Sequence, residues 1–327
     1  MSRLRPYRVT TGRSASNYHE QVASNYASTA NSFAYYTWIV DELLAAGQAL
    51  VPVSAIRHEP PGGRRHSALR HDIDADPIAA VRCSRHLARL GVAGSFYLLH
   101  TAPYYGDVHD GVFVRNPAVI DWVRAMIVAG SEIGLHIDPF GLMRDHGMDG
   151  VEAVKAEIHW LRTQTANVTG TVSHNSAAVN GGAENYEVFA RHVLLRRKVR
   201  RPDRTVLPLG VLQMSSLGLD YEGTCARPHE RPDRAAALAF LQETSPGGVR
   251  DAAWMRRYLV DNPACGWDVE CQCWLIGRDE WVVGGRPRGE ALFESSVSGG
   301  RMLELVRGLP ARSRTLFVVH PEYVRLP

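Results

Sequence analysis

The chain has 327 residues, of which 45% are hydrophobic and 22% charged, and both fractions are those of ordinary soluble globular proteins. They exclude a fibrous or wholly disordered protein, and one barrel of alternating strands and helices can account for the whole length. The formal net charge is only +3, and arginine is in general excess along the chain, so we expect no nucleic-acid partner.

Targeting signals are not apparent in the sequence. Residues 1–26 are rich in Ser, Thr and Asn and lack the apolar stretch of about 7–15 residues that a secretory signal needs. No run of about 18 uncharged apolar residues occurs, so no membrane-spanning helix and no membrane partner are expected. The five cysteines form an odd set, which favours reduced thiols over a disulfide framework. We therefore expect a cytoplasmic protein.

Strands and helices alternate through the first half of the chain. Apolar residues at helical spacing predict a lead-in helix over about residues 31–47, which ends at a glycine suited to a helix C-cap. Beyond a loop rich in proline and glycine, short apolar runs predict strands over 67–74, 94–99, 131–136 and 168–174, and helical spacing predicts helices over 77–91, 116–130 and 150–165. This alternation predicts an α/β protein with parallel strands.

The regular pattern weakens in the second half. We expect an irregular insertion over about residues 176–262, in which 186–195 has a helical pattern, 205–214 resembles a strand, and 231–243 and 251–260 are helical or loop-bound. A β-branched apolar run predicts a last strand over 315–319. The expected architecture is one domain, residues 1–327, built as a distorted (β/α) barrel.

A cysteine cluster and a basic run in the second half suggest binding sites, but each has a simpler explanation. Cys265, Cys271 and Cys273 lack a C-x-x-C pair, so free cysteines are favoured over a structural zinc site. The basic run from Arg196 to Arg204 can bind a phosphate or an acidic partner, but such runs are usually solvated loops.

Polar residues that can bind a metal stand where four of the predicted strands end. They are Asp72 and Asp74, His136, His174 and His320. Parallel strands bring their carboxyl ends together, and carboxylate oxygens with imidazole nitrogens are the ligands of a catalytic divalent metal, above all zinc. Alternation along a strand puts Asp72 and Asp74 on one face and the intervening Ile73 on the other.

These positions suggest separate roles around one ion. Asp74, His136 and His174 are the candidate metal ligands, and Asp72 lies near enough to serve as a general base toward a metal-activated water. His320 is the candidate proton donor to a leaving amine. His71 should point away from both aspartates because it alternates with them.

Four segments together resemble the motifs of polysaccharide-deacetylase-like proteins. Leu69-Arg70-His71-Asp72-Ile73-Asp74 resembles the R-H-D-[VI]-D opening, and the later matches are Gly91-Val92-Ala93-Gly94-Ser95-Phe96-Tyr97, Gly130-Ser131-Glu132-Ile133-Gly134-Leu135-His136 and Val318-Val319-His320-Pro321-Glu322-Tyr323. The resemblance spans roughly residues 30–325. It implies a barrel with fewer than eight full units, Asp72 as base, Asp74 and His136 as metal ligands, and His320 as the catalytic histidine.

One departure from that family affects the metal site. The second motif usually reads H-x-x-x-H, but Phe140 stands four residues after His136. We expect His174 to replace the missing histidine, with Asp138 as the weaker substitute, because two protein ligands would hold a metal poorly. If neither replaces it, the chain is a catalytically silent relative.

The resemblance favours removal of an N-acyl group, above all N-acetyl, from an amino sugar, a nucleotide sugar or a related small metabolite. Two alternatives stay open: a carbohydrate-binding relative without a working metal site, and another metal-dependent hydrolase such as a phosphoesterase. The oligomeric state is not predicted.

Overall fold

The computed structural model describes residues 4–12, 26, 28–56, 63–164, 166–174, 185–189, 198–200, 206–208, 212–225, 227–228 and 268–325. Most of the insertion expected at 176–262 lies outside these residues, including the segments 231–243 and 251–260. Of the predicted helix 186–195, the structure describes a 3-10 helix at Asn185–Phe189, and of the strand-like 205–214 it describes a strand at Val206–Pro208.

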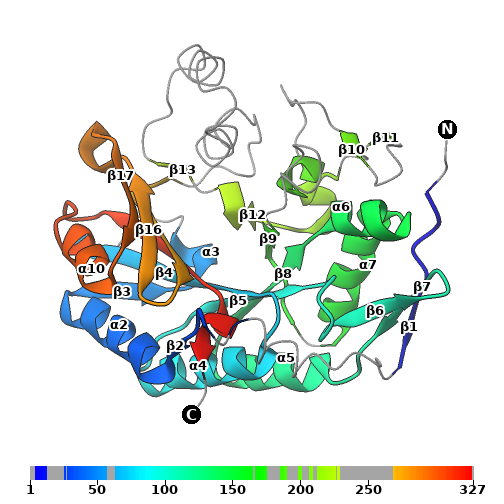
Figure 1. Cartoon of the computed structure of the whole chain (residues 1–327), viewed down its shortest axis with the longest axis horizontal. Coiled ribbons are helices and arrows are strands. Elements are labelled where there is room, and N and C mark those ends of the chain that lie inside the picture. The colour runs from blue at the N-terminus through cyan, green and yellow to red at the C-terminus, as the bar shows by residue number, and fades with distance from the viewer. Residues whose placement is uncertain are drawn as a thin grey trace.

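A ten-stranded sheet is the main element of the fold (Figure 1). Its spatial order is β12 (Tyr221–Glu222), β9 (Gly170–Ser173), β8 (Glu132–Ile137), β5 (Ser95–Leu99), β4 (Arg65–Ile73), β18 (Arg314–Val319), β15 (Cys271–Gly277), β16 (Glu280–Gly285) and β17 (Leu292–Val297), with β3 (Gln48–Val51) beside the first half of β4. The strands from β12 to β15 run parallel, whereas β16 and β17 are antiparallel additions. The five strands predicted from the sequence are confirmed.

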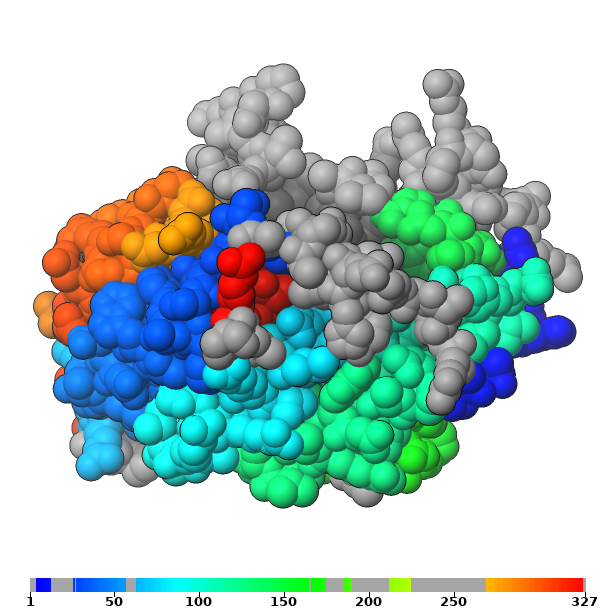
Figure 2. Space-filling view, turned by 60° about the horizontal axis from the view of Figure 1, so that its bottom comes forward, coloured from blue at the N-terminus to red at the C-terminus, as the bar shows by residue number. Residues whose placement is uncertain are grey.

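Seven α-helices lie among the described residues, of which the longer ones cover one face of this sheet and one of four residues packs on the other. They are α2 (Phe33–Ala45), α3 (Val53–Ile56), α4 (Pro77–Arg89), α5 (Val119–Val128), α6 (Pro139–Gly141), α7 (Gly150–Thr163) and α10 (Gly299–Arg307). Helices α2, α4 and α5 lie side by side beneath the strands in Figure 1, and Figure 2 shows them covering that face in chain order. The four helices predicted over 31–47, 77–91, 116–130 and 150–165 are confirmed, although α5 begins later than expected because residues 116–118 form a turn ahead of it.

Short polar side chains begin several of these helices. Ser32 accepts a hydrogen bond from the first turn of α2, Asp76 from that of α4, and Asp149 from that of α7. Each satisfies backbone N–H groups that have no partner within the helix, which fixes where the helix starts.

Smaller elements surround the main sheet. They are a three-stranded sheet of β1 (Val9–Thr11), β7 (Val112–Arg115) and β6 (Gly106–His109), and the pairs β2 (Asn31–Ser32) with β19 (Val324–Arg325), β10 (Lys198–Arg200) with β11 (Val206–Pro208), and β13 (Arg227–Pro228) with β14 (Asp268–Val269). Further short helical turns lie at Leu142–His146, Met214–Leu217, Gly223–Cys225, Pro287–Gly289 and Pro321–Tyr323. Within the described ranges, no helix has the length and apolar character needed to cross a bilayer.

The two faces of the sheet carry different side chains, as strand alternation requires. On the helix-covered face, residues such as Leu69 and Phe317 join the large core, whereas Ala68 and Leu316 belong to a smaller core on the other face. Arg70 and Asp72 alternate with Leu69 and therefore share the face of the smaller core. The predicted site residues thus stand at the edge of that face.

A polar network crosses the same face below the strand ends. The hydroxyl of Tyr97 lies 2.7 Å from that of Tyr221, which donates to Glu132, and Ser95 donates to the same carboxylate. A Cβ added at Gly134 would lie 2.4 Å from the Tyr97 ring, so only glycine allows this ring to cross β8.

The sheet is open in the residues that the structure describes. Its edge strands β12 and β17 are not paired with each other there, so the strand order does not close into a barrel within them. The observed architecture is a mixed α/β fold with one large, mostly parallel sheet.

Candidate metal centre

The carboxyl ends of neighbouring parallel strands bring the predicted metal ligands together. Asp74 directly follows β4, His136 lies near the end of β8, His174 directly follows β9, and His320 directly follows β18. In the sheet order β9, β8, β5, β4, β18 these strands are contiguous and parallel, so all four residues lie at one edge.

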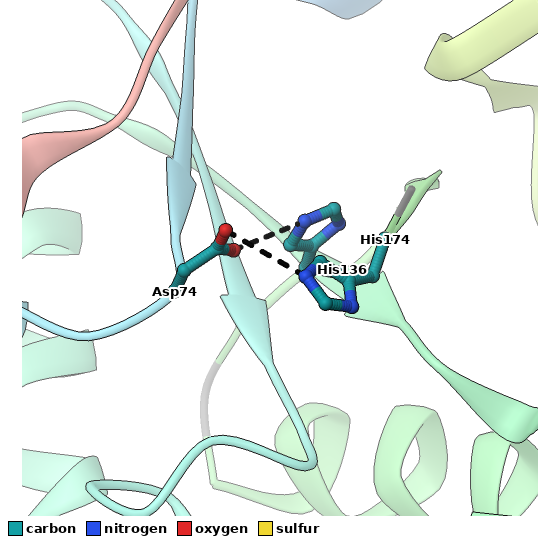
Figure 3. Close-up of side chains that lie close together, drawn as sticks. All are labelled: Asp74, His136 and His174. Carbon is teal, nitrogen blue, oxygen red and sulfur yellow. Dashed lines mark ion pairs between the residues drawn. The ribbon is translucent and has the colours of Figure 1, made fainter. Parts of the chain in front are cut away.

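Asp74 is the residue that the histidines share. Its Oδ1 lies 3.2 Å from Nε2 of His136, and its Oδ2 lies 3.7 Å from Nε2 of His174 (Figure 3). One ligand atom from each of the three residues lies within 4.8 Å of the other two. The three side chains together can hold a metal ion.

The donor set fits a divalent metal of borderline softness. One carboxylate and two imidazoles are three protein ligands, which leaves a coordination position for water or substrate as in catalytic zinc sites. Oδ1 of Asp74 is buried and accepts no well-aligned hydrogen bond from the described residues, and Nε2 of His136 lies 3.2 Å from it. A cation at this point would give Oδ1 of Asp74 the partner that no hydrogen-bond donor of the described residues supplies.

The protonation of this cluster reflects its opposite charges. Burial alone would raise the pKa of Asp74, but the close polar contact with His136 and the charges of His136, His320 and His174 hold it well below its usual range. For His174 burial opposes the charged form, yet the facing Asp138 and the Asp74 carboxylate raise the pKa to about 9. A bound cation therefore has to displace a proton from this imidazole.

His136 is oriented by a backbone carbonyl. Its Nδ1 lies 3.1 Å from the oxygen of Val172, to which it donates, and this hydrogen bond leaves Nε2 with its lone pair toward Asp74. His136 is 1% exposed, so its ring has little freedom to leave this orientation.

Asp72 lies beside the centre but is held by an arginine. Arg70 donates from Nε to Oδ1 at 2.8 Å and from Nη2 to Oδ2 at 2.5 Å. Oδ2 also lies 3.8 Å from Nε2 of His136, so Asp72 and Asp74 face the same imidazole, as the D-x-D spacing predicts. Burial would raise the pKa of Asp72, but Arg70 and His136 keep it low, so the carboxylate stays ionised.

His320 approaches the centre from β18. Its Nε2 lies 3.6 Å from Oδ2 of Asp74, and its ring packs against Tyr323 with centroids 5.5 Å apart. Burial lowers the pKa of His320, with partial opposition from the Asp74 and Asp72 carboxylates. The structure therefore places His320 next to the metal ligands, with the neutral imidazole favoured.

The position of the missing second-motif histidine belongs to the core. Phe140 is buried in the large hydrophobic cluster and takes no part in the centre. Of the two proposed substitutes, His174 joins the cluster that can hold a metal. Asp138 instead caps α6 by accepting from the Gly141 N–H at 3.0 Å, and it also accepts from Asn185 at 2.9 Å.

Three residues of this region were missed by the sequence analysis. The hydroxyl of Tyr104 donates to the carbonyl of Ile73 at 2.9 Å and so holds the end of β4. Nε2 of His100 accepts the backbone N–H of Asp138 at 2.8 Å. His100 directly follows the predicted strand 94–99, so the strand-end rule could have found it. No sequence signal marked the third residue, Asn185.

The other sequence candidates lie away from this centre. Cys271 and Cys273 are buried free cysteines on β15 with sulfur atoms 3.9 Å apart, and burial raises the pKa of the Cys273 thiol. Cys265 lies outside the described residues, as does most of the basic run, of which Lys198 and Arg200 stand on β10.

His71 points into the core, as its alternation with the aspartates predicts. Its Nε2 lies 2.9 Å from the Tyr36 hydroxyl, its Nδ1 lies 3.2 Å from the Ser95 carbonyl, and its ring stacks on Phe96 at 4.1 Å. Burial lowers the pKa of His71 from 6.5 to about 4. The fold therefore keeps this imidazole neutral in mildly acidic solution.

Acidification should destabilise the protein through this residue. Below pH 6.5 the unfolded chain takes up a proton at His71 that the folded chain accepts only near pH 4, so the free energy of unfolding falls across this interval. The full effect is about 3 kcal/mol. Urea titrations between pH 7.5 and 4 should show a smaller loss in His71→Gln than in wild type. His109→Gln, on an exposed histidine of β6, is the control, and equal losses in all three proteins would contradict the expectation.

Comparison with known proteins returned no match. No family model, no curated protein and no solved structure is significantly similar to this chain.

Proposed function

We propose that this chain is a zinc-dependent deacetylase of the polysaccharide-deacetylase type, formed by a single incomplete (β/α) barrel. The observation that carries the proposal is the convergence of Asp74, His136 and His174, whose ligand atoms lie within 4.8 Å of one another beside a further carboxylate. The four motif resemblances support the same assignment, since they give Asp74 and His136 the positions of metal ligands in that family, with His174 as the proposed replacement for the histidine that the second motif lacks.

Each residue then has a distinct task. Asp74, His136 and His174 hold the ion, which when bound acts as a Lewis acid toward the acyl carbonyl and toward water. Asp72 accepts the proton of the attacking water, and the Arg70 pair fixes its carboxylate in place. His320 has to take up a proton first, and as the imidazolium it passes that proton to the departing amine.

The proposed substrate is an N-acetylated amino sugar, free or linked to a nucleotide, or a related small metabolite. The motif resemblance supports this class, because the chemistry of that family is hydrolysis of an N-acyl group on an amino sugar. The carboxylates and imidazoles of the site suit the same reaction, which needs both a proton acceptor for water and a proton donor for the amine.

The test is zinc-dependent acetate release. Purified protein should release acetate from at least one member of a panel of N-acetyl amino sugars and their nucleotide-linked forms, lose this activity on chelation, and recover it with zinc. Phosphate release from phosphomonoesters, measured in parallel, would instead favour a phosphoesterase. Purified protein that binds no zinc and releases acetate from no member of the panel would favour a catalytically silent relative and contradict the proposal.

A further inference from the structure

The carboxylate of Asp138 occupies the side of His174 that faces away from Asp74. Nε2 of His174 is directed at Asp74, whereas Nδ1 lies 3.7 Å from Oδ2 of Asp138. This Nδ1 is buried and has no hydrogen-bond partner within the described residues. The carboxylate of Asp138 is the acceptor that faces it.

Asp138 is itself fixed from several directions. Its Oδ1 accepts from the Gly141 N–H and from Nδ2 of Asn185, and its Oδ2 accepts from the Thr101 hydroxyl at 3.1 Å. Its backbone N–H donates to His100. The same Asn185 amide also donates to the His174 carbonyl at 2.8 Å, so one side chain is hydrogen-bonded to both Asp138 and His174.

Closing this 3.7 Å contact to a hydrogen bond would decide which nitrogen of His174 is free. A neutral imidazole carries one proton, and a hydrogen bond from Nδ1–H to a carboxylate keeps that proton on Nδ1 and leaves the Nε2 lone pair available. Metal-bound histidines commonly have such a partner, which fixes the tautomer and the ring orientation.

We infer that Asp138 is a positioning residue that holds His174 in the Nδ1–H tautomer so that Nε2 binds the metal. The inference rests on the metal centre of the proposed function and replaces the weaker role of Asp138 as a substitute ligand. His136 and His174 then reach the ion in the same way, the first oriented by a backbone carbonyl and the second by a carboxylate.

Asp138→Asn tests this role with little change in shape. Oδ1 would keep its two donors and still cap α6, since asparagine caps helices as well as aspartate. The amide NH₂ would then replace Oδ2, donate toward His174 and drive its proton onto Nε2. Zinc affinity, measured by calorimetry at pH 7.5, should fall about 10-fold to 100-fold.

Asp149→Asn is the matched control. Asp149 caps α7 by accepting from the N–H groups of Val151 and Glu152, and it takes no part in the candidate centre. The same exchange at the same helix position should leave zinc affinity at the wild-type value. Circular dichroism should show both variants folded.

A second measurement does not depend on the variant. Long-range nitrogen–proton NMR spectra of zinc-loaded wild-type protein should show His174 protonated at Nδ1 and metal-bound at Nε2. The inference is overturned if that spectrum shows the proton on Nε2, or if Asp138→Asn binds zinc as tightly as wild type. Wild-type protein that binds no zinc at all would instead contradict the proposed function on which the inference depends.

Discussion

Replacing Asp74 with asparagine should weaken zinc binding by more than about 100-fold, a larger loss than changes around metal ligands usually cause. Asparagine has nearly the same shape, but it removes the negative charge that faces His136, His174 and His320. Without that charge the remaining protein ligands are two neutral imidazoles, which hold a divalent ion poorly. Acetate release should disappear together with the metal.

Two readouts separate this loss from a folding defect. Zinc should raise the thermal unfolding temperature of the wild-type protein and leave that of Asp74→Asn unchanged, because a ligand stabilises only the folded state that binds it. Asp107→Asn, in an exposed pair with His109 on β6, is the matched control and should bind zinc like wild type. An Asp74→Asn protein with wild-type zinc affinity would remove Asp74 from the metal centre.

The first half of the fold and the metal cluster could be predicted because each depends on a local rule. A buried parallel strand is an apolar run, and the residues at or just after its carboxyl end lie at one edge of the sheet with their counterparts from neighbouring strands. Asp74, His136 and His174 all obey this rule. It requires only that β4, β8 and β9 be parallel and near one another, which β/α alternation already implies.

Apart from the strand β18, the second half could not be predicted, because its pairing is not set by local pattern. Cys271, Cys273 and Leu275 are buried at alternate positions of β15, a strand that was not predicted because its cysteines were weighed only as zinc ligands or free thiols. The antiparallel additions β16 and β17 break the β/α alternation from which the earlier strands were recognised.

The arrangement of polar side chains around the metal ligands was likewise beyond the sequence. The pairing of Arg70 with Asp72 joins two residues of one strand, but spacing alone does not show that the guanidinium turns toward its neighbour rather than toward solvent. The hydrogen bond from Asn185 to Asp138 joins residues 47 positions apart, and Asn185 lies in a segment whose sequence has no regular pattern. Such contacts depend on tertiary packing, which the one-dimensional pattern does not encode.

Replacing Arg115 with methionine should lower the free energy of unfolding by about 3–5 kcal/mol, because it would leave Glu157 buried without its cation. Glu157 is fully buried, and Arg115 donates to it from Nε at 2.9 Å and from Nη2 at 2.6 Å. The hydroxyls of Tyr7 and Tyr105 donate to the same carboxylate at 2.7 and 2.8 Å. Methionine can still pack on Trp160, over which the guanidinium now lies, so the loss reports mainly on the charge.

Urea denaturation of a double-mutant cycle would isolate this effect. Arg115→Met combined with Glu157→Gln removes both charges and should be more stable than the sum of the single losses predicts, because no ion is left buried alone. Arg301→Met is the matched control on the surface, where Arg301 pairs with Glu294 at 2.7 Å and Glu304 at 3.2 Å. Solvent screens these exposed pairs, so the urea midpoint should stay near the wild-type value. Equal midpoints for Arg115→Met and Arg301→Met would mean that the buried pair does not hold β7 against α7 as its geometry indicates.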